Sequence, residues 1–429
     1  MYYQPEIETM ERGALRALQS KRLQAMLQRQ SNAVPFYREK FKALGIHPGD
    51  ITLIEQLSSL PFTYKNDLRD QYPYGLFAEP MEAVRRIHAS SGTTGKPTVV
   101  GYTAADLDIF DEVVARSLVC AGARPGMKLH NAYGYGLFTG GLGMHGGATK
   151  LGMAVIPVSG GMTERQLTIL QDFAPEVMCC TPSYAQTLAG ECKKRGIDPE
   201  RLAVKHAILG AEPWTEAIRS EVEAGLKVSA TNIYGLSEII GPGVSQEDFE
   251  EKGSGSYVWE DHFYPEIVDK DTGEVLPYGQ EGVLVFTTLT KQALPLLRYW
   301  TNDICSLHYD PDGKRTHVKM STIKGRADDM LIIRGVNLFY TQVEEVIEQL
   351  AYLTPNYQLI VSRPGTMDEV AVKVEVAPGV DAQQQALAAE LKQKIKDSIG
   401  ISMKVKLLPP ESIPRSQGGK LSRIVDQRA

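Results

Sequence analysis

A nine-residue stretch of this chain, residues 90–98, combines the residue types that bind phosphate. It reads Ser-Ser-Gly-Thr-Thr-Gly-Lys-Pro-Thr. Its glycines let the backbone turn N–H groups towards an anion, its hydroxyls donate hydrogen bonds, and its lysine adds positive charge. The stretch therefore predicts a phosphate-binding loop, with candidate ligand residues Ser90, Ser91, Gly92, Thr93, Thr94, Gly95 and Lys96.

The loop departs from the P-loop of nucleoside triphosphatases. That motif requires glycine where this chain has Ser90, and serine or threonine where it has Pro97. Residues 84–87 and 99–102 fit two strands that the loop joins. A flexible surface hairpin is the alternative that composition alone leaves open.

Two later segments carry side chains that suit a nucleotide. Residues 232–238 read Asn-Ile-Tyr-Gly-Leu-Ser-Glu, in which Tyr234 can stack on a purine and Glu238 can hold Mg²⁺ against phosphates. Asp303, in the segment 298–303, can accept hydrogen bonds from ribose hydroxyls. Each has a structural alternative: a strand end with a solvated glutamate for the first, and an Arg298–Asp303 ion pair for the second.

Two weaker segments follow towards the C-terminus. Residues 325–329, Gly-Arg-Ala-Asp-Asp, lie at a composition boundary and suit either a hinge or a plain linker. Lys420 ends a glycine-rich stretch, where a lysine is most often a solvated surface charge.

Composition limits the classes of partner and location. The 429 residues carry a net charge of −6, which gives no general attraction to nucleic acid or to an anionic membrane. No apolar run is long enough to span a bilayer, and the first thirty residues lack a signal-peptide pattern. The five cysteines show no C-x-x-C spacing, which predicts reduced, mostly buried thiols in a cytoplasmic protein.

The elements that position these segments fall into an α/β class. Between residues 127 and 209, buried apolar runs alternate with amphipathic segments, which indicates parallel α/β layers. Residues 257–290 read strand-turn-strand, which predicts a separate, largely antiparallel sheet or barrel. We expect a large multi-subdomain body over residues 1–327 and a small mobile α+β cap over residues 328–429.

The cap shows two clear local patterns. Residues 341–344, Thr-Gln-Val-Glu, predict a capping box that opens a helix. Valines at 370, 372, 374 and 376 alternate as in a half-buried strand.

The order of the five segments resembles the acyl-adenylate-forming superfamily of coenzyme A synthetases, peptide-synthetase adenylation domains and luciferases. The resemblance runs from residue 80 to the C-terminus. Within that superfamily, three stretches are most similar to the ligases that join arylacetates such as phenylacetate to coenzyme A: residues 88–98, residues 131–138 (Asn-Ala-Tyr-Gly-Tyr-Gly-Leu-Phe) and residues 259–263 (Trp-Glu-Asp-His-Phe).

The resemblance implies an ATP-dependent, Mg²⁺-dependent reaction in two steps. The carboxylate of an aryl acid attacks the α-phosphate of ATP, and the thiol of coenzyme A then displaces AMP. Lys420 and Glu238 are implied as catalytic, with Glu238 also holding the metal. An amine or a carrier-protein thiol is the alternative acceptor, and a nucleotide sensor with a decayed site is a third possibility.

The resemblance also assigns binding residues. Besides the 90–96 loop, the nucleotide residues implied are Ala211, Glu212, Pro213, Tyr234, Gly235, Ser237, Asp303 and Arg326. Asp328 matches the hinge about which the cap rotates, and Arg334, Gly335 and Val336 are implied to line the coenzyme A tunnel. A homodimer is also implied.

Aromatic and aliphatic residues beside a glycine-rich turn predict the acyl pocket, and its candidates are Tyr133, Phe138, Ile233 and Pro242. A plain core cluster is the alternative. Related ligases carry a zinc knuckle before the hinge, where this chain offers only Cys305, His308 and His317, so we expect no structural zinc. The sequence does not identify which arylacetic acid is the substrate.

Overall fold

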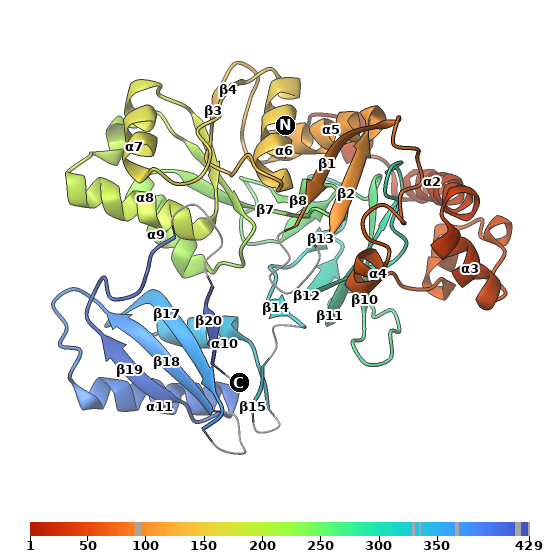
Figure 1. The fold of residues 1–429 in the computed structure, drawn as a ribbon. Helices are drawn as coiled ribbons and strands as arrows, with labels where there is room; N and C mark the ends of the chain where they lie inside the picture. The colour runs from red at the N-terminus through yellow and green to blue at the C-terminus, as the bar shows by residue number, and fades with distance from the viewer. Residues whose placement is uncertain (91–96, 328–330, 334–335, 365–368, 417–421, 428–429) are drawn as a thin grey trace. The chain divides into compact units, whose positions relative to one another are not determined.

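The computed structural model describes residues 1–429 except 91–96, 328–330, 334–335, 365–368, 417–421 and 428–429 (Figure 1). The chain forms two compact units, each described by itself. The first, here called the body, comprises Met1–Cys180, Glu200–Ala211 and Val228–Thr322. The second, called the cap unit, comprises Thr181–Pro199, Glu212–Lys227 and Ile323–Ala429. The boundary expected at residue 328 stays a prediction.

Parallel strands form one half of the body's main sheet, as the alternating pattern predicts. In sheet order β4-β3-β5-β6-β7, neighbouring strands pair in parallel. Their apolar runs suit strands buried on both faces. The strands are β3 (Lys128–Asn131), β4 (Ala154–Ile156), β5 (Val177–Cys180), β6 (His206–Gly210) and β7 (Ser229–Leu236).

The other half of this sheet is antiparallel. From β7 the hydrogen-bonded order continues through β8, β9, β13, β12, β11 and β10. The antiparallel strands expected over residues 257–290 are therefore present, but they continue the parallel sheet through β9 and β8 where we expected a separate sheet. Their bounds are β8 (Gly241–Glu247), β9 (Ser256–Val258), β10 (Phe263–Val268), β11 (Glu281–Thr288), β12 (Tyr299–His308) and β13 (Lys319–Met320).

A separate hairpin carries the predicted phosphate loop. Strands β1 (Val84–Ala89) and β2 (Val99–Thr103) pair in antiparallel fashion, which confirms the two flanking strands. Directly after β2, the Thr103 hydroxyl accepts a hydrogen bond from the Asp106 N–H, and the Asp106 carboxylate accepts one from the Thr103 N–H. This capping box begins helix α5 (Ala104–Cys120), so hairpin and helix are joined without a loop.

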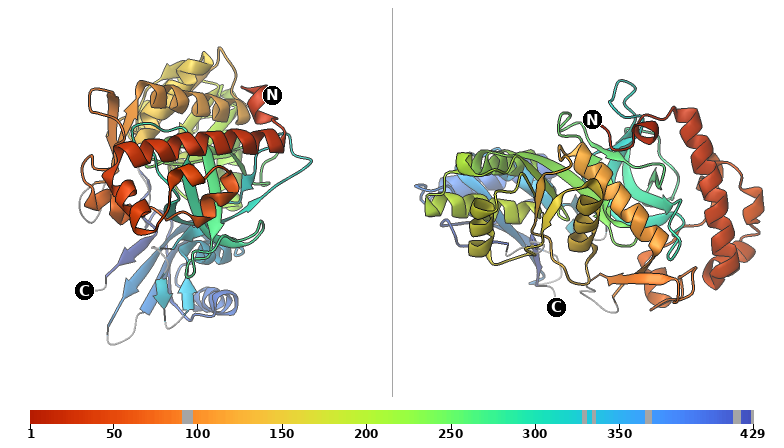
Figure 2. Two further views of the ribbon diagram at one scale, coloured as in Figure 1. Left: turned by 90° about the vertical axis from the view of Figure 1, so that its right-hand side faces the viewer. Right: turned by 90° about the horizontal axis from the view of Figure 1, so that it is seen from above.

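The remaining body helices are α1 (Pro5–Glu8), α2 (Arg12–Ala33), α3 (Pro35–Ala43), α4 (Lys65–Asp70), α6 (Thr139–Leu151) and α7 (Thr163–Asp172). Figure 2 shows α2 as the long red helix at one side of the body. Gln19 of α2 donates to the Glu260 carbonyl at 3.0 Å, and Arg12 binds the Glu260 carboxylate. Among the residues that the structure describes, no helix combines the length and apolar character needed to cross a membrane.

The cap unit has its own sheet, of order β19-β18-β17-β20. The predicted alternation is confirmed on β18 (Glu369–Val376), where all four valines are buried. The other elements are α8 (Pro182–Arg195), α9 (Glu216–Leu226), β14 (Gly325–Arg326), β15 (Leu331–Ile333), β16 (Val336–Leu338), α10 (Tyr340–Glu348), β17 (Leu353–Ser362), α11 (Gln385–Ile399), β19 (Lys404–Leu408) and β20 (Ile424–Asp426).

The predicted capping box at residues 341–344 is wrong by two residues. Helix α10 begins at Tyr340, and the cap is formed by the Gln342 side chain, which accepts from the Phe339 N–H at 3.0 Å. The Thr341 hydroxyl donates to the Lys324 carbonyl instead, and Glu344 points to Arg423 at 3.2 Å. Both side chains that the motif assigned to capping, Thr341 and Glu344, therefore bind groups outside the helix instead.

Glu344 is a buried carboxyl group within the cap unit. Burial raises its pKa to about 7, although the Arg423 guanidinium opposes that rise. Glu348, Glu212 and Glu345 add like charge that raises it further. Because the folded pKa exceeds the ordinary value of 4.5, protonation of Glu344 stabilises the fold. That contribution is complete below about pH 4.5 and is lost as pH rises through 7.

We predict that Glu344→Gln flattens the pH dependence of stability. The neutral amide cannot ionise, so the free energy of unfolding relative to the wild type should rise by about 1–3 kcal/mol between pH 5 and pH 8. Urea unfolding of both proteins at the two pH values measures this change in the free energy of unfolding. The exposed neighbour Glu345→Gln is the matched control, and equal behaviour of both variants would contradict the assignment.

Candidate functional site

Two predicted nucleotide residues meet on the body's sheet. Tyr234 lies on β7 and Asp303 on β12, and the tyrosine hydroxyl donates to Asp303 Oδ2 at 2.6 Å. The Tyr234 ring stacks on Phe286 of β11 with the ring centroids 6.3 Å apart. This contact fixes the orientation of the phenol ring, so a flat apolar face and a carboxylate are presented together. The sheet thereby joins groups that are 69 residues apart in sequence.

The Arg298–Asp303 ion pair proposed as an alternative does not form. Arg298 is buried, and its Nε lies 2.9 Å from Glu266 Oε2. Its Nη1 also donates to the carbonyls of Ser58 and Leu60, both at 2.8 Å. Arg298 therefore stabilises the body, and Asp303 is not its partner.

The turn between β7 and β8 holds Glu238. At its base Gly235 packs so tightly that a Cβ atom there would lie 1.9 Å from the Gly241 carbonyl oxygen. Tyr102 of β2 donates its hydroxyl to the Ile240 carbonyl at 2.8 Å, and Thr139 of α6 is 3.1 Å from the Ser237 hydroxyl. Backbone packing and two side-chain contacts therefore fix this turn.

Glu238 itself has the character expected of a cation ligand. Its side chain is largely buried, with 7% of the residue exposed. Within the described part of the chain, its carboxylate has no hydrogen-bond or ion-pair partner. Lys291 acts on this carboxylate only from beyond contact distance, and a nearly buried carboxylate without a contacting partner is costly, so a bound cation such as Mg²⁺ fits this position.

The base of the phosphate loop lies on the same hairpin as Tyr102. The Ser90 N–H donates to the Thr98 carbonyl at 2.9 Å, and the Thr98 N–H donates to Ser90 Oγ at 3.3 Å. These bonds close the loop at its two ends. The other loop residues, 91–96, lie outside the described residues.

Lys291 is a site residue that the motifs missed. Its Nζ lies 3.3 Å from the Glu238 carbonyl oxygen and 4.5 Å from the Tyr102 ring centroid. The residue is only 3% exposed, and burial lowers its pKa to about 8. The available signal was a lone lysine three residues after the strong strand predicted over residues 283–288.

The predicted acyl-pocket residues lie around a glycine-rich turn. Asn131 shapes it by donating to the Gly141 carbonyl at 2.8 Å and accepting from the Tyr133 N–H at 3.2 Å. A Cβ atom at Gly141 would lie 2.4 Å from the Gly134 carbonyl oxygen. Of the pocket candidates, Tyr133 and Ile233 are buried, Pro242 is half-buried and Phe138 is exposed. Their shared pocket stays a prediction.

Several implied residues belong to different units or lie outside the described residues. Ala211 belongs to the body with a φ of 73°, whereas Glu212, Pro213 and Arg326 belong to the cap unit. The Glu212 carboxylate there accepts from the Ser183 N–H at 3.2 Å. Val336 is on β16, and Asp328, Arg334, Gly335 and Lys420 lie outside the described residues. Their roles remain predictions.

Two of the residues considered for zinc, His308 and His317, have separate hydrogen-bond partners. Cys305 is buried, His308 is hydrogen-bonded to the Ser254 carbonyl at 3.0 Å, and His317 Nδ1 accepts from the Glu260 N–H at 3.1 Å.

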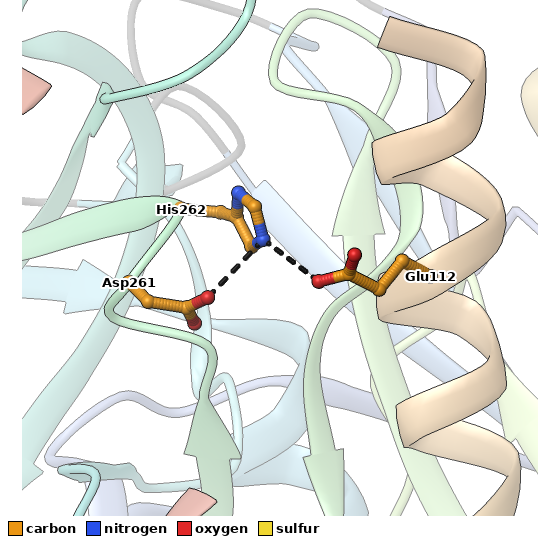
Figure 3. A group of neighbouring side chains, drawn as sticks. All are labelled: Glu112, Asp261 and His262. Carbon is orange, nitrogen blue, oxygen red and sulfur yellow. Dashed lines mark hydrogen bonds and ion pairs between the residues drawn. The ribbon is translucent and has the colours of Figure 1, made fainter. Parts of the chain in front are cut away.

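A different group, Glu112, Asp261 and His262, lies within reach of one ion (Figure 3). The His262 Nε2 atom is 3.1 Å from Asp261 and 3.2 Å from Glu112. The buried Arg116 guanidinium binds both carboxylates, at 2.7 Å from Asp261 and 3.1 Å from Glu112, and Arg22 supplies a second positive charge 3.5 Å from Asp261. It holds the pKa of Asp261 well below its usual range despite burial, as do the neighbouring histidines. The arrangement therefore satisfies its charges as an ion network.

Comparison with known proteins places these features in a family. Residues 56–290 match the model of the AMP-binding enzymes, and residues 335–428 match that of the AMP-binding enzyme C-terminal domain. The phenylacetate-coenzyme A ligase of Thermus thermophilus is 59% identical over the whole of both chains. That of Escherichia coli is 49% identical, covering 98% of this chain and 97% of the relative.

Solved structures of another ligase are similar to this chain over nearly its whole length. A 2-hydroxyisobutyryl-CoA ligase in the postadenylation state, bound to an acyl-AMP, aligns with a TM-score of 0.91 at 26% identity. The alignment covers 99% of this chain and 92% of that one. The same ligase is also known in complex with 2-HIB-AMP and CoA, in the thioesterification state, and aligns with a TM-score of 0.75.

We predict that Gly235→Ala disrupts the β7–β8 turn. The added methyl would collide with backbone at Gly241, so the free energy of unfolding should fall by about 1–3 kcal/mol and ATP affinity should fall by at least about tenfold. Urea unfolding and titration calorimetry measure these effects.

Gly49→Ala is the control, because a Cβ atom there meets nothing within 4 Å. It should bind ATP as the wild type does. Wild-type ATP affinity in Gly235→Ala would show that the turn does not shape the nucleotide site.

Proposed function

The chain belongs to the AMP-binding enzyme family, and on that premise we propose that it is an ATP-dependent ligase joining phenylacetate or a related arylacetate to coenzyme A. The observation that carries this proposal is 59% identity over the full length of both chains to a relative named phenylacetate-coenzyme A ligase. The Tyr234–Asp303 pair and the fixed Glu238 turn supply a site of matching chemistry.

The first step must bring two anions together. The carboxylate of the acid attacks the α-phosphate of ATP, a P–O bond forms, and pyrophosphate leaves with the electron pair of the broken bond. The coenzyme A thiol then attacks the acyl carbon and AMP departs. Preorganised positive charge and hydrogen-bond donors lower the first barrier because they are aimed at charge that develops in the transition state.

Each body residue has a proposed role in binding. The Tyr234 ring covers the adenine, while Asp303 accepts hydrogen bonds from the ribose hydroxyls. Their mutual hydrogen bond orients both groups before the nucleotide arrives, which reduces the entropy lost on binding. Glu238 is the residue that would hold Mg²⁺, and the metal, when bound, supplies positive charge between the phosphates.

The remaining roles follow from the family. The aryl slot is lined by Tyr133, Phe138, Ile233 and Pro242. The edge of the purine slot is formed by Ala211, Glu212 and Pro213.

The nucleotide is supported by Gly235 and Ser237. Arg326 reinforces the ribose or phosphate contact, and Asp328 is the hinge. Arg334, Gly335 and Val336 line the coenzyme A tunnel. Lys420 stabilises the charge of adenylation. A cytoplasmic homodimer completes the proposal.

Product analysis tests the proposed function directly. The protein is incubated with ATP, Mg²⁺, coenzyme A and a panel of arylacetates, and the products are identified by mass spectrometry. We expect an aryl-coenzyme A thioester together with AMP and pyrophosphate. Pyrophosphate exchange without thioester would indicate an amine or carrier-protein acceptor, and no turnover across the panel would refute the ligase.

We predict that Lys420→Ala separates the two half-reactions. Adenylation should slow by about 10²–10³-fold, because a preorganised charge contact contributes about 3–4 kcal/mol to the transition state. Conversion of supplied phenylacetyl-adenylate to thioester should continue. Lys404→Ala, which removes an exposed lysine of the cap unit, should leave both steps unchanged. Equal losses in both steps for Lys420→Ala would refute its assigned role.

A further inference from the structure

The segment 289–293, here called the Lys291 loop, directly follows β11 and is held on both sides of Lys291. On the N-terminal side, the Leu289 N–H donates to the His262 carbonyl at 2.8 Å. The His262 Nδ1 atom is also 2.8 Å from the Thr290 hydroxyl. His262 thus binds two consecutive residues immediately before Lys291.

On the other side, Asp106 binds two residues immediately after Lys291. Its Oδ1 accepts from the Gln292 N–H at 2.6 Å, and its Oδ2 accepts from the Ala293 N–H at 2.9 Å. Asp106 is fully buried and also belongs to the capping box that begins α5. The start of α5 therefore sets the backbone position of the loop.

The ion network of Figure 3 fixes His262. Its Nε2 atom lies between the Asp261 and Glu112 carboxylates, and Arg116 binds both of these groups. Since Glu112 and Arg116 both lie on α5, the same helix holds the loop through Asp106 and through His262. The Trp-Glu-Asp-His-Phe motif has no contact assigned to it in the nucleotide site. Its residues Asp261 and His262 instead hold the Lys291 loop in place.

The result is a defined position for the Lys291 ammonium. Its Nζ donates to the Glu238 carbonyl, and its charge lies over the Tyr102 ring. Tyr102 in turn donates to the Ile240 carbonyl. Two side chains therefore bind the carbonyls of the turn that carries the Glu238 carboxylate.

The partners of Lys291 differ from those of a structural buried lysine. Lys319, which is equally buried, lies 3.0 Å from Glu251 and 3.4 Å from Asp310. For Lys291, no carboxylate among the described residues lies within ion-pairing distance of Nζ. Its counter-charges, Asp106 and Glu238, act on it from beyond contact distance, and burying an ammonium without a contacting carboxylate is costly.

We propose that Lys291 is a positioning residue for adenylation, which holds the Glu238 turn and places a fixed positive charge beside it. This role rests on the proposed ligase function. It assigns Lys291 to the first half-reaction, in which a carboxylate must approach a phosphate. The second half-reaction, attack by the coenzyme A thiol, does not need the charge.

The test is Lys291→Met, which keeps the length of the side chain and removes the charge. Adenylation, measured by pyrophosphate exchange, should fall by about 10–100-fold, with a raised KM for Mg²⁺·ATP, because a displaced turn misplaces Glu238. Conversion of supplied phenylacetyl-adenylate to thioester should stay within about threefold of the wild type. Lys291→Arg should restore part of the adenylation rate.

Lys319→Met is the matched control, since it removes another buried lysine that lies over a tyrosine ring. It should lower stability and leave both half-reactions intact. Should Lys291→Met fail to fold, Thr290→Val removes only the hydrogen bond to His262 and should slow adenylation by about 3–10-fold.

Adenylation within about threefold of the wild type in a folded Lys291→Met variant would overturn the inference. So would equal losses in the two half-reactions. Both results are interpretable only if the wild-type chain makes the thioester, so failure of the ligase assignment is distinguished from failure of this role.

Discussion

The tight turn between β7 and β8 is the constraint on which the candidate site depends. Gly235 packs against the Gly241 backbone too closely for any side chain, so β7 and β8 stay paired as far as Leu236 and Gly241 and the chain turns over residues 237–240. Tyr234 thereby remains on the sheet, opposite Asp303, while Glu238 projects from the turn. Tyr234 and Glu238 thus lie within a few residues of the end of β7, and the sheet brings Asp303 of β12 to Tyr234.

Buried charge is the second organising feature of the body. Arg116, Asp261, Glu112 and His262 form one ion network, and Arg298 pairs with Glu266 in another place. Such groups are costly to desolvate and are retained where their geometry is needed. The first network is connected to the candidate site, because His262 and Asp106 hold the loop from which Lys291 contacts the Glu238 carbonyl.

Much of this arrangement could be predicted because its signals are local. The flanking strands of the 90–98 loop and the parallel layers follow from short motifs or periodicity, and Tyr234 and Asp303 are each singled out by a motif, although their mutual hydrogen bond is not predicted. Hydrogen-bond and ion-pair partners that are far apart in the sequence could not be predicted from such local signals. The Glu266 partner of Arg298, the Arg423 partner of Glu344 and the Glu238 carbonyl that binds Lys291 come from distant segments that only the folded sheet brings together.

The central claim is that this site forms an acyl-adenylate. Phenylacetate labelled with ¹⁸O in its carboxylate, turned over with ATP and coenzyme A, tests it most directly. Attack of the carboxylate on the α-phosphate leaves one carboxyl oxygen in the AMP that is later released. We expect AMP that carries a single ¹⁸O atom by mass spectrometry. Unlabelled AMP beside a normal yield of thioester would contradict it.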